Sequence, residues 1–365
     1  MRFTRRAALG GVVALGLSTS LRAFAHPGHS APPAAPKSFT ALFEGLEADI
    51  RDHWSGRADA WARAAILDLN GVVWAQAYAG HGADQTSPQD WLDRPAPVFD
   101  LGKPMLASAA ARLSQAGRIA LNAPLTLSAF GRTVLSPRGE GLARATLAQL
   151  LSHGAGLPFD AAGAEPVRQV APAGTGFAYS DLGYRLAGVA IAQAVEAPLS
   201  DILRAEVFAP LGITQARLDA EGRVGSMTAG LAALCRFAQG LLQAGTGSSD
   251  WLSAEALAVM ARQVWLTDPP LGGYGLGLSS FPAADSYGLG HSGGQGEAAA
   301  VLTVYPEYGL GYTALASDGA SFAALAGLDA VLDQTIAGGL IQKRATPAGL
   351  SAAEVFSARA EPGAL

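Results

Sequence analysis

The chain has 365 residues, with 25 basic and 30 acidic side chains, a formal net charge of −5, and 50% hydrophobic but only 15% charged residues. This balance is typical of a compact globular protein and excludes a largely disordered chain. No run of basic residues follows the N-terminal region, which argues against nucleic acid as a partner. After residue 25, no apolar run is long enough to cross a membrane.

The first 25 residues predict an export signal. Arg5 and Arg6 precede an apolar run that ends in Ala23-Phe24-Ala25, which matches an A-x-A cleavage site. The paired arginines favour the twin-arginine route, with an ordinary secretory signal as the alternative. Removal of this segment takes four arginines and no acid, so the net charge changes from −5 to −9. We therefore expect a periplasmic or secreted protein.

The elements that follow are predicted in chain order. Residues 26–39 form a linker rich in proline and alanine, and residues 40–55 form a helix. Two apolar runs flank an Asn70-Gly71 pair, which predicts a hairpin. Residues 103–116 read as a helix with Pro104 in its first turn and Gly117 after its end.

The second half changes from helices back to strands. Residues 140–262 carry Ala and Leu at helical spacing, and Cys235, the single cysteine, is expected to be buried on a helix. Residues 296–319 have a strand pattern with a turn at Pro306, and a helix is expected at about 320–339. The predicted fold class is α/β of the α+β type, an antiparallel sheet flanked by helices plus an all-helical subdomain. One domain would cover 40–342, with a sheet subdomain at about 40–100 and 270–340, a helical subdomain at about 120–265, and a loose tail at 343–365.

Four stretches together carry a family resemblance. They are "FDLGKPML" (99–106), "TLAQLLSHGAGLP" (146–158), the segment 177–213 that begins "FAYSDLGY", and "YGLGLSS" (274–280) followed by "GLGHSGGQGEAAAVLTVY". Their order and spacing resemble the serine β-lactamase and penicillin-binding-protein superfamily, in particular its class C-like branch, from about residue 60 to 335. The resemblance implies a β-lactamase/transpeptidase-like fold.

The family's chemistry needs three motifs, and this sequence keeps them unequally. Ser-x-x-Lys places a serine nucleophile and a lysine on one face of a helix start. The resemblance puts Lys103 at the serine and Leu106 at the lysine. For the Tyr-x-Asn motif it gives Tyr179 and Asp181, so the amide is replaced. For the His-x-Gly motif it gives His291, Ser292 and Gly293, followed by Gly294, with glycines that would allow a ligand close to the backbone.

Three interpretations of Lys103 remain open. In the first, Ser108 is a displaced nucleophile, but no lysine follows it at the family spacing. In the second, Lys103 is itself the nucleophile or base, because a helix N-terminus and burial favour the neutral amine. In the third interpretation, the resemblance places Lys103 close to Asp181, and the two form a buried ion pair in a retired site, because a buried lysine without a partner costs several kcal/mol, roughly. We favour the third.

The functional hypothesis is a degenerate member of the family that cannot form a serine acyl-enzyme. It would bind a small acyl, peptide or cell-wall-like ligand, or a partner, with Asp181, Ser292, Gly293 and Gly294 as ligand-binding residues. The alternative is a hydrolase or acyltransferase that uses Lys103 with Tyr179 and His291. A purely structural role with a collapsed cleft is the third class. We expect no cofactor and no metal, and we interpret Ser152 and His153 as structural.

Overall fold

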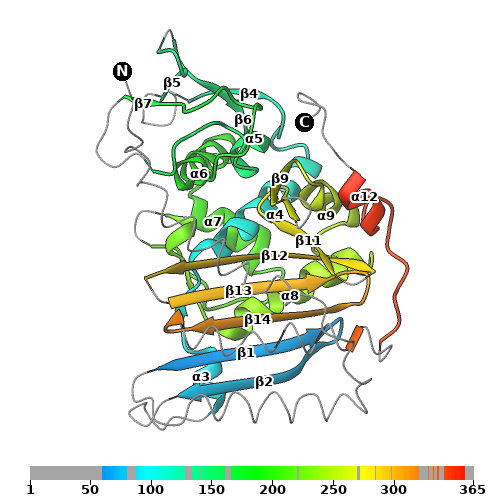
Figure 1. Cartoon of the computed structure of the whole chain (residues 1–365). Coiled ribbons are helices and arrows are strands. Elements are labelled where there is room, and N and C mark those ends of the chain that lie inside the picture. Colours follow the sequence, from blue (N-terminus) through cyan, green and yellow to red (C-terminus); the bar gives the residue numbers. More distant parts are fainter. Residues whose placement is uncertain are drawn as a thin grey trace, which may run out of the picture.

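The computed structural model describes residues 60–79, 88–127, 134–139, 141–160, 166–219, 222–268, 272–283, 285–296, 298–319, 328, 332, 335–336 and 341–357 (Figure 1). The expected signal segment, the linker and the helix at 40–55 lie outside these residues, as does most of the helix expected at 320–339. The domain boundaries stay a prediction.

One antiparallel sheet dominates the described part of the chain. It has eight strands in the order β2-β1-β14-β13-β12-β11-β10-β9, so the early strand β1 pairs directly with the late strand β14 (Figure 1). This confirms the expected fold class. The strand bounds are β1 Trp61–Asp68, β2 Gly71–Ala79, β9 Trp265–Asp268, β10 Gly272–Tyr274, β11 Ser279–Ala283, β12 Ser286–Gln295, β13 Ala298–Tyr305 and β14 Leu310–Ala316.

The two turns expected from the sequence are both present. Asp68 accepts hydrogen bonds from the backbone N–H groups of Asn70 and Gly71, which closes the β1–β2 hairpin. Residues 306–309 connect β13 to β14, and Gly309 has a φ of 64°, which suits glycine. Three short strand pairs lie outside the main sheet: β3 Ala96–Pro97 with β8 Thr228–Ala229, β4 Pro124–Thr126 with β6 Arg144–Thr146, and β5 Val134–Leu135 with β7 Val167–Arg168.

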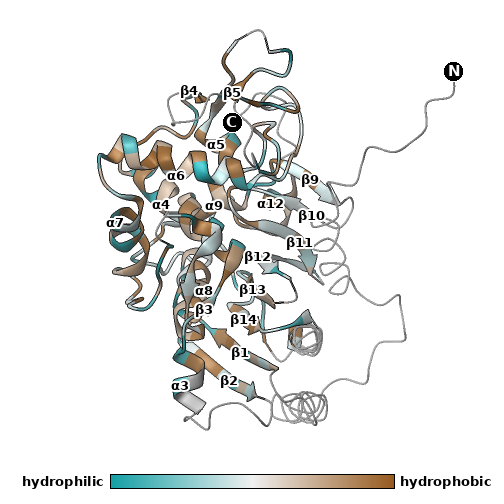
Figure 2. Cartoon of the chain, turned by 90° about the vertical axis from the view of Figure 1, so that its left-hand side faces the viewer, coloured by the Kyte–Doolittle hydropathy of each residue, from teal (hydrophilic) through white to brown (hydrophobic). Residues whose placement is uncertain are grey.

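The helices cover one face of the sheet and extend beyond it (Figure 2). α8 packs against β1, β13 and β14, and Cys235 is buried on it, as expected. The bounds are α3 Pro88–Asp93, η1 Phe99–Leu101, α4 Gly102–Gln115, α5 Leu147–Leu151, α6 Asp181–Val195, α7 Leu199–Leu203, η3 (a π-helical turn) Arg204–Phe208, η4 Val224–Ser226, α8 Leu231–Gly245, α9 Ala254–Ala261 and α12 Ala352–Ser357.

Both faces of the sheet are buried, because side chains alternate along each strand. On β1, Ala65 and Leu67 belong to the large core under the helices, whereas Ala64 and Ile66 belong to a second core. That second core also contains Leu328 and Leu332, which come from the part of the chain after β14. The sheet is therefore a buried central layer, and β12 at its middle is a rigid support for the side chains near its end.

Helix α4 lies at the centre of the helical part. The sequence predicts one buried face, but the structure buries every residue from Gly102 to Ala111, including Lys103. The start of α4 fits tightly under η4, since a Cβ atom on Gly102 would lie 2.1 Å from the carbonyl oxygen of Val224. Because α4 is enclosed on all sides, the polar groups at its start must find partners inside the protein.

No helix among the described residues is by itself long and apolar enough to cross a membrane. By length and composition alone, the pair Asp181–Val195 and Leu199–Phe208, bent by 83°, passes that test.

Candidate functional site

Two chain segments meet at the start of α4. η1 brings Asp100, the first turn of α4 brings Lys103, the approach to α6 brings Tyr179, and the first residue of α6 is Asp181. Asp100, Lys103, Tyr179 and Asp181 are called the Lys103 cluster below. The turn before α6 is fixed by Ser180, whose hydroxyl accepts from the N–H of Gly183 and donates to the carbonyl of Pro158.

The Lys103 amine is fully enclosed by three acceptors. Its Nζ lies 2.8 Å from Oδ1 of Asp100, 2.6 Å from the Tyr179 hydroxyl and 2.5 Å from Oδ1 of Asp181. The Lys103 side chain is 0% exposed. An ammonium group has three N–H donors, so all of them are used. This arrangement confirms the Lys103–Asp181 ion pair.

Asp100 is a partner that the sequence analysis missed. It lies three residues before Lys103, and this spacing brings two side chains together on a helical turn. The i, i+3 spacing in "FDLGK" is therefore the sequence signal for this pair. With two carboxylates and one ammonium, the cluster carries one excess negative charge when all three groups are ionised.

The two carboxyl groups differ in environment. Burial alone would raise the pKa of Asp100, but the charges of Lys103 and His291 and its hydrogen bonds hold that pKa below the ordinary value. Burial raises the pKa of Asp181 above its ordinary value despite the Lys103 charge. The Asp181 side chain is 38% exposed, against 13% for Asp100. Asp181 is thus the part of the cluster that solvent reaches.

Tyr179 stays protonated between its partners. It accepts from Lys103 and donates to Oδ2 of Asp100 at 3.0 Å. Burial, followed by the charges of Asp100 and Asp181, raises the pKa of Tyr179 well above its ordinary value. Its ring also contacts the Lys103 amine, with Nζ 4.1 Å from the ring centroid. A phenol held in this state is a structural hydrogen-bond partner and a poor base.

His291 lies in a neighbouring network. Its Nδ1 is 2.7 Å from the Ser292 carbonyl oxygen, and its Nε2 is 3.1 Å from the Tyr274 hydroxyl. The carbonyl can only accept, so Nδ1 carries the proton and Nε2 accepts from Tyr274. Burial lowers the pKa of His291 to about 4. The structure thus places His291 near the cluster but bonds it to Tyr274 instead of Lys103 or Tyr179.

Tyrosine and histidine rings fill the space behind the cluster. Tyr184 donates to the Leu151 carbonyl at 2.5 Å, and its hydroxyl lies 3.5 Å from that of Tyr274. Nδ1 of His153 accepts from the N–H of Ser180 at 3.0 Å, and the ring lies 4.1 Å from the Tyr179 ring. Burial lowers the pKa of His153 well below its ordinary value. His153 is thus a buried packing residue, as the sequence suggested, and within the described residues it makes no hydrogen bond to Ser152.

The glycines of β12 allow other backbone segments of this protein to pack closely against the strand. A Cβ atom on Gly293 would lie 2.5 Å from the backbone nitrogen of Asp100, and one on Gly294 would lie 2.7 Å from the Ala298 carbonyl oxygen. The sequence favours close approach by a ligand at these glycines, whereas in the structure the close neighbours are residues of this protein. Phe99, next to Asp100, has a φ of 48°, an uncommon value for a residue with a side chain.

Ser108 does not reach the cluster surface. It is fully buried, and its hydroxyl donates to the Pro104 carbonyl one turn earlier at 2.9 Å. Ser292 contributes its carbonyl to His291. In the described parts of the chain, no three His, Cys, Asp or Glu side chains lie together in a way that could hold a metal ion.

Comparisons with known proteins agree on the fold. The family model described as "Beta-lactamase" matches residues 62–335. An octameric penicillin-binding protein homologue from Pyrococcus abyssi is 20% identical, with a TM-score of 0.65 over 80% of this chain and 77% of that one. A beta-lactamase/D-alanine carboxypeptidase from Yersinia pestis, complexed with citrate, is 18% identical, with a TM-score of 0.65 over 82% and 98%.

A third similar structure is EstCE1, a hydrolase with promiscuous acyltransferase activity. It is 16% identical, with a TM-score of 0.67 over 81% of this chain and 99% of that one. No curated protein sequence matches this chain significantly. At these identities, the solved structures show a shared fold.

Replacement of Lys103 by methionine tests the balance of charge in the cluster. Lys103→Met leaves Asp100 and Asp181 without their cation, so we expect the free energy of unfolding to fall by about 3–5 kcal/mol. As a control, Arg204→Met breaks the exposed pair with Asp201 and should cost less than about 1 kcal/mol. Urea denaturation at pH 7 measures both changes. Equal stability of Lys103→Met and the unmodified protein would contradict this account of the cluster.

Acidification should destabilise the fold through the buried histidines. The unfolded chain has imidazoles with an ordinary pKa near 6.5, roughly, so between about pH 6.5 and 4 it binds more protons than the folded state. The free energy of unfolding should therefore fall as pH falls through this window. The His291 shift corresponds to about 3 kcal/mol.

Denaturation curves at pH 7, 5.5 and 4.5 test this with His291→Gln beside the unmodified protein. In His291→Gln, the free energy of unfolding should fall less between pH 7 and 4.5, because the contribution of His291 is missing. The pKa of Asp181 is raised, so its protonation stabilises the folded state as pH falls, opposite to the effect of His291. This contribution is the same in both proteins and does not affect the comparison. Identical pH dependence in the two proteins would show that His291 does not titrate as argued.

Proposed function

Because this chain belongs to the β-lactamase family, we propose that it is a ligand-binding member that does not form a serine acyl-enzyme. The family model covers residues 62–335, and the similar structures include hydrolases and an acyltransferase. In place of acyl-enzyme formation, the Lys103 cluster would have a binding role. It would hold a small acyl, peptide or cell-wall-like ligand, or a partner, at the exposed edge of the Lys103 cluster.

The environment of the Lys103 amine is the observation that carries the proposal. The family resemblance aligns Lys103 with the serine nucleophile. Two carboxylates within 2.8 Å stabilise the protonated ammonium, and a protonated amine has no lone pair with which to attack a carbonyl. The same amine is inaccessible to solvent. Ser108, the nearby hydroxyl on α4, is buried as well.

The exposed edge of the cluster has features of a binding surface. Asp181 offers a partly exposed carboxylate, and Phe159, which is 46% exposed, stacks near Tyr179 with ring centroids 6.2 Å apart. The backbone of Phe159 also accepts from the N–H of Asp181 at 2.9 Å, so the two positions are held together. An aromatic face beside a carboxylate suits a ligand that has both an apolar and a polar part.

A hydrolase or acyltransferase remains the alternative function. One observation favours it, because Lys103 and Tyr179 lie 2.6 Å apart, within the range of a nucleophile and its base. Three observations weigh against it: the amine is paired twice, the Tyr179 phenol has a raised pKa, and His291 is bonded to Tyr274. The binding function fits all of these facts.

Intact-mass spectrometry separates the two functions. The mature protein is incubated with a fluorophosphonate, a penicillin and a p-nitrophenyl ester, beside Lys103→Ala. We expect an unchanged mass and no ester turnover above buffer, because no accessible nucleophile occupies the cluster. A stable adduct or turnover that is lost in Lys103→Ala would make Lys103 catalytic and reject the proposal.

A ligand screen by thermal shift then tests the binding function itself. The panel contains acylated amino acids, D-amino-acid dipeptides and muropeptide fragments, with Asp181→Asn as the matched variant. We expect at least one compound to raise the melting temperature of the unmodified protein and to do so less in Asp181→Asn. If no compound stabilises the protein, an interaction role with the cleft closed becomes the better interpretation.

We also propose that the protein is exported by its twin-arginine signal and works in the periplasm or outside the cell. This rests on Arg5-Arg6 and the A-x-A site at residues 23–25. In a bacterium with this pathway, the periplasmic protein should begin at His26 by mass spectrometry. Replacement of both Arg5 and Arg6 by lysine should keep the precursor in the cytoplasm, whereas Arg22→Lys should not. Normal export of the double variant would point to an ordinary secretory signal.

A further inference from the structure

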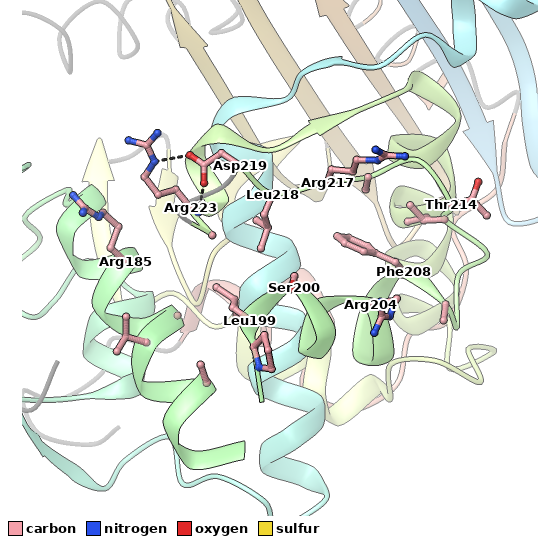
Figure 3. Close-up of a pocket in the computed structure, with 18 of the residues that line it drawn as sticks. Arg185, Leu199, Ser200, Arg204, Phe208, Thr214, Arg217, Leu218, Asp219 and Arg223 are labelled. Carbon is pink, nitrogen blue, oxygen red and sulfur yellow. Dashed lines mark hydrogen bonds and ion pairs between the residues drawn. The ribbon is translucent and has the colours of Figure 1, made fainter. Parts of the chain in front are cut away.

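A cavity of about 1000 Å³ lies in the helical part of the protein, apart from the Lys103 cluster (Figure 3). Its walls come from α6, from α7 and η3, and from residues within 212–219 and 222–223. None of Lys103, Tyr179, Asp181 and His291 lines it. It begins one turn along α6 from the cluster, because Arg185 in its wall lies four residues after Asp181 on the same helix face.

The inner wall of the cavity is apolar. Leu199, Phe208 and Leu218 come from three different segments, and Figure 3 shows their side chains around the same space. Val189 on α6 adds a side chain that is 38% exposed. Val189, Leu199 and Leu218 keep exposed apolar surface, and contact with an apolar group would stabilise the complex by about 25 cal/mol per Å² removed from water, whereas Phe208 is already buried. A purely polar ligand would leave the apolar wall of the cavity exposed to water.

The polar groups around the cavity are mostly cationic. Four arginines line it against one acid, Asp219, in a chain whose net charge is −5. Three of them have acidic partners: Arg223 with Asp219 at 2.5 Å, Arg204 with Asp201 at 2.8 Å, and Arg185 with Asp160 at 3.7 Å. The fourth is Arg217.

Arg217 is exposed and has no acidic partner within the described part of the chain. Its backbone is held firmly, because its N–H and C=O both bond to Thr228 at 2.9 Å. Figure 3 shows its side chain on the same side of the cavity as Phe208 and Thr214. A guanidinium on a fixed backbone, next to an apolar wall, is suited to an anionic group that carries an aliphatic chain.

We propose that this cavity binds a monomeric anionic amphiphile, with a carboxylate on Arg217 and an aliphatic chain over Leu199, Phe208 and Leu218. The volume is at the upper end of the range of small-molecule sites, which is about 300–1,000 Å³. A cationic amphiphile would meet Arg217 as a like charge. A short carboxylate would reach the arginine but would leave the apolar wall exposed to water. This site is independent of the function proposed for the Lys103 cluster.

Isothermal titration calorimetry on the mature protein tests the chemistry of the ligand. The probes are decanoate, butyrate and decyltrimethylammonium, each below its critical micelle concentration. We expect saturable binding of decanoate, and at least about tenfold weaker binding of butyrate and of the cation. Equal affinity for decanoate and decyltrimethylammonium would overturn the proposal, because the arginine would then have no role.

Three variants locate the site. Arg217→Glu should weaken decanoate binding about tenfold or more, because it replaces a charge-assisted hydrogen bond with repulsion. Val189→Asp should also weaken decanoate binding, because it places a charged carboxylate in the apolar wall of the cavity. Arg262→Glu makes the same charge change at an exposed arginine outside the cavity and should leave the affinity unchanged.

Arg217 and Val189 are partly or fully exposed, so the variants should stay folded, which thermal denaturation checks. If Arg217→Glu and Arg262→Glu weaken decanoate binding equally, the effect is one of overall charge and the proposal fails. Unchanged binding in both Arg217→Glu and Val189→Asp would place decanoate elsewhere and would also overturn it.

Discussion

The burial of one ammonium group constrains the whole helical side of this protein. Lys103 stands at the start of a helix that is enclosed on all sides, where a charge without partners would cost several kcal/mol, roughly. Asp100, Tyr179 and Asp181 offset that cost, and they come from two segments separated by more than seventy residues. The entry to α4 and the start of α6 therefore cannot move apart without exposing or unpairing the charge.

The surroundings of the ion pair reinforce this constraint. The rings of Tyr179, Tyr184 and His153 exclude water from the Lys103 amine, and low polarity strengthens each charged hydrogen bond. Two residues with side chains, Phe99 and His153, adopt positive φ values of 48° and 58° in contact with this network. Such backbone conformations cost energy, and they persist only where contacts with the surrounding structure hold them in place. The cluster is preorganised around an internal ion pair, and this preorganisation supports the binding function that we propose for its edge.

Sequence patterns predicted the fold and the central contact but not the orientation of every group. The hairpin at Asn70 and the helix beginning near Lys103 followed from local signals. The Lys103–Asp181 pair followed from the family resemblance, which places the two positions close together, and from the cost of an unpaired buried charge. Asp100 was missed although its spacing to Lys103 is local. The bonding of His291 to Tyr274 could not be predicted, since it depends on how β10 and β12 lie in the folded sheet. The cavity beside Arg217 likewise arises where three separate segments pack together.

The complete burial of Lys103 also decides how the protein can be handled chemically. The chain has 22 arginines but only three lysines, Lys37, Lys103 and Lys343. Acylating reagents need an accessible, unprotonated amine, and Lys103 offers neither, whereas the Lys343 side chain is 37% exposed. Of the two lysines that the structure describes, an amine-reactive dye or resin would therefore attach through Lys343 and leave the Lys103 cluster untouched.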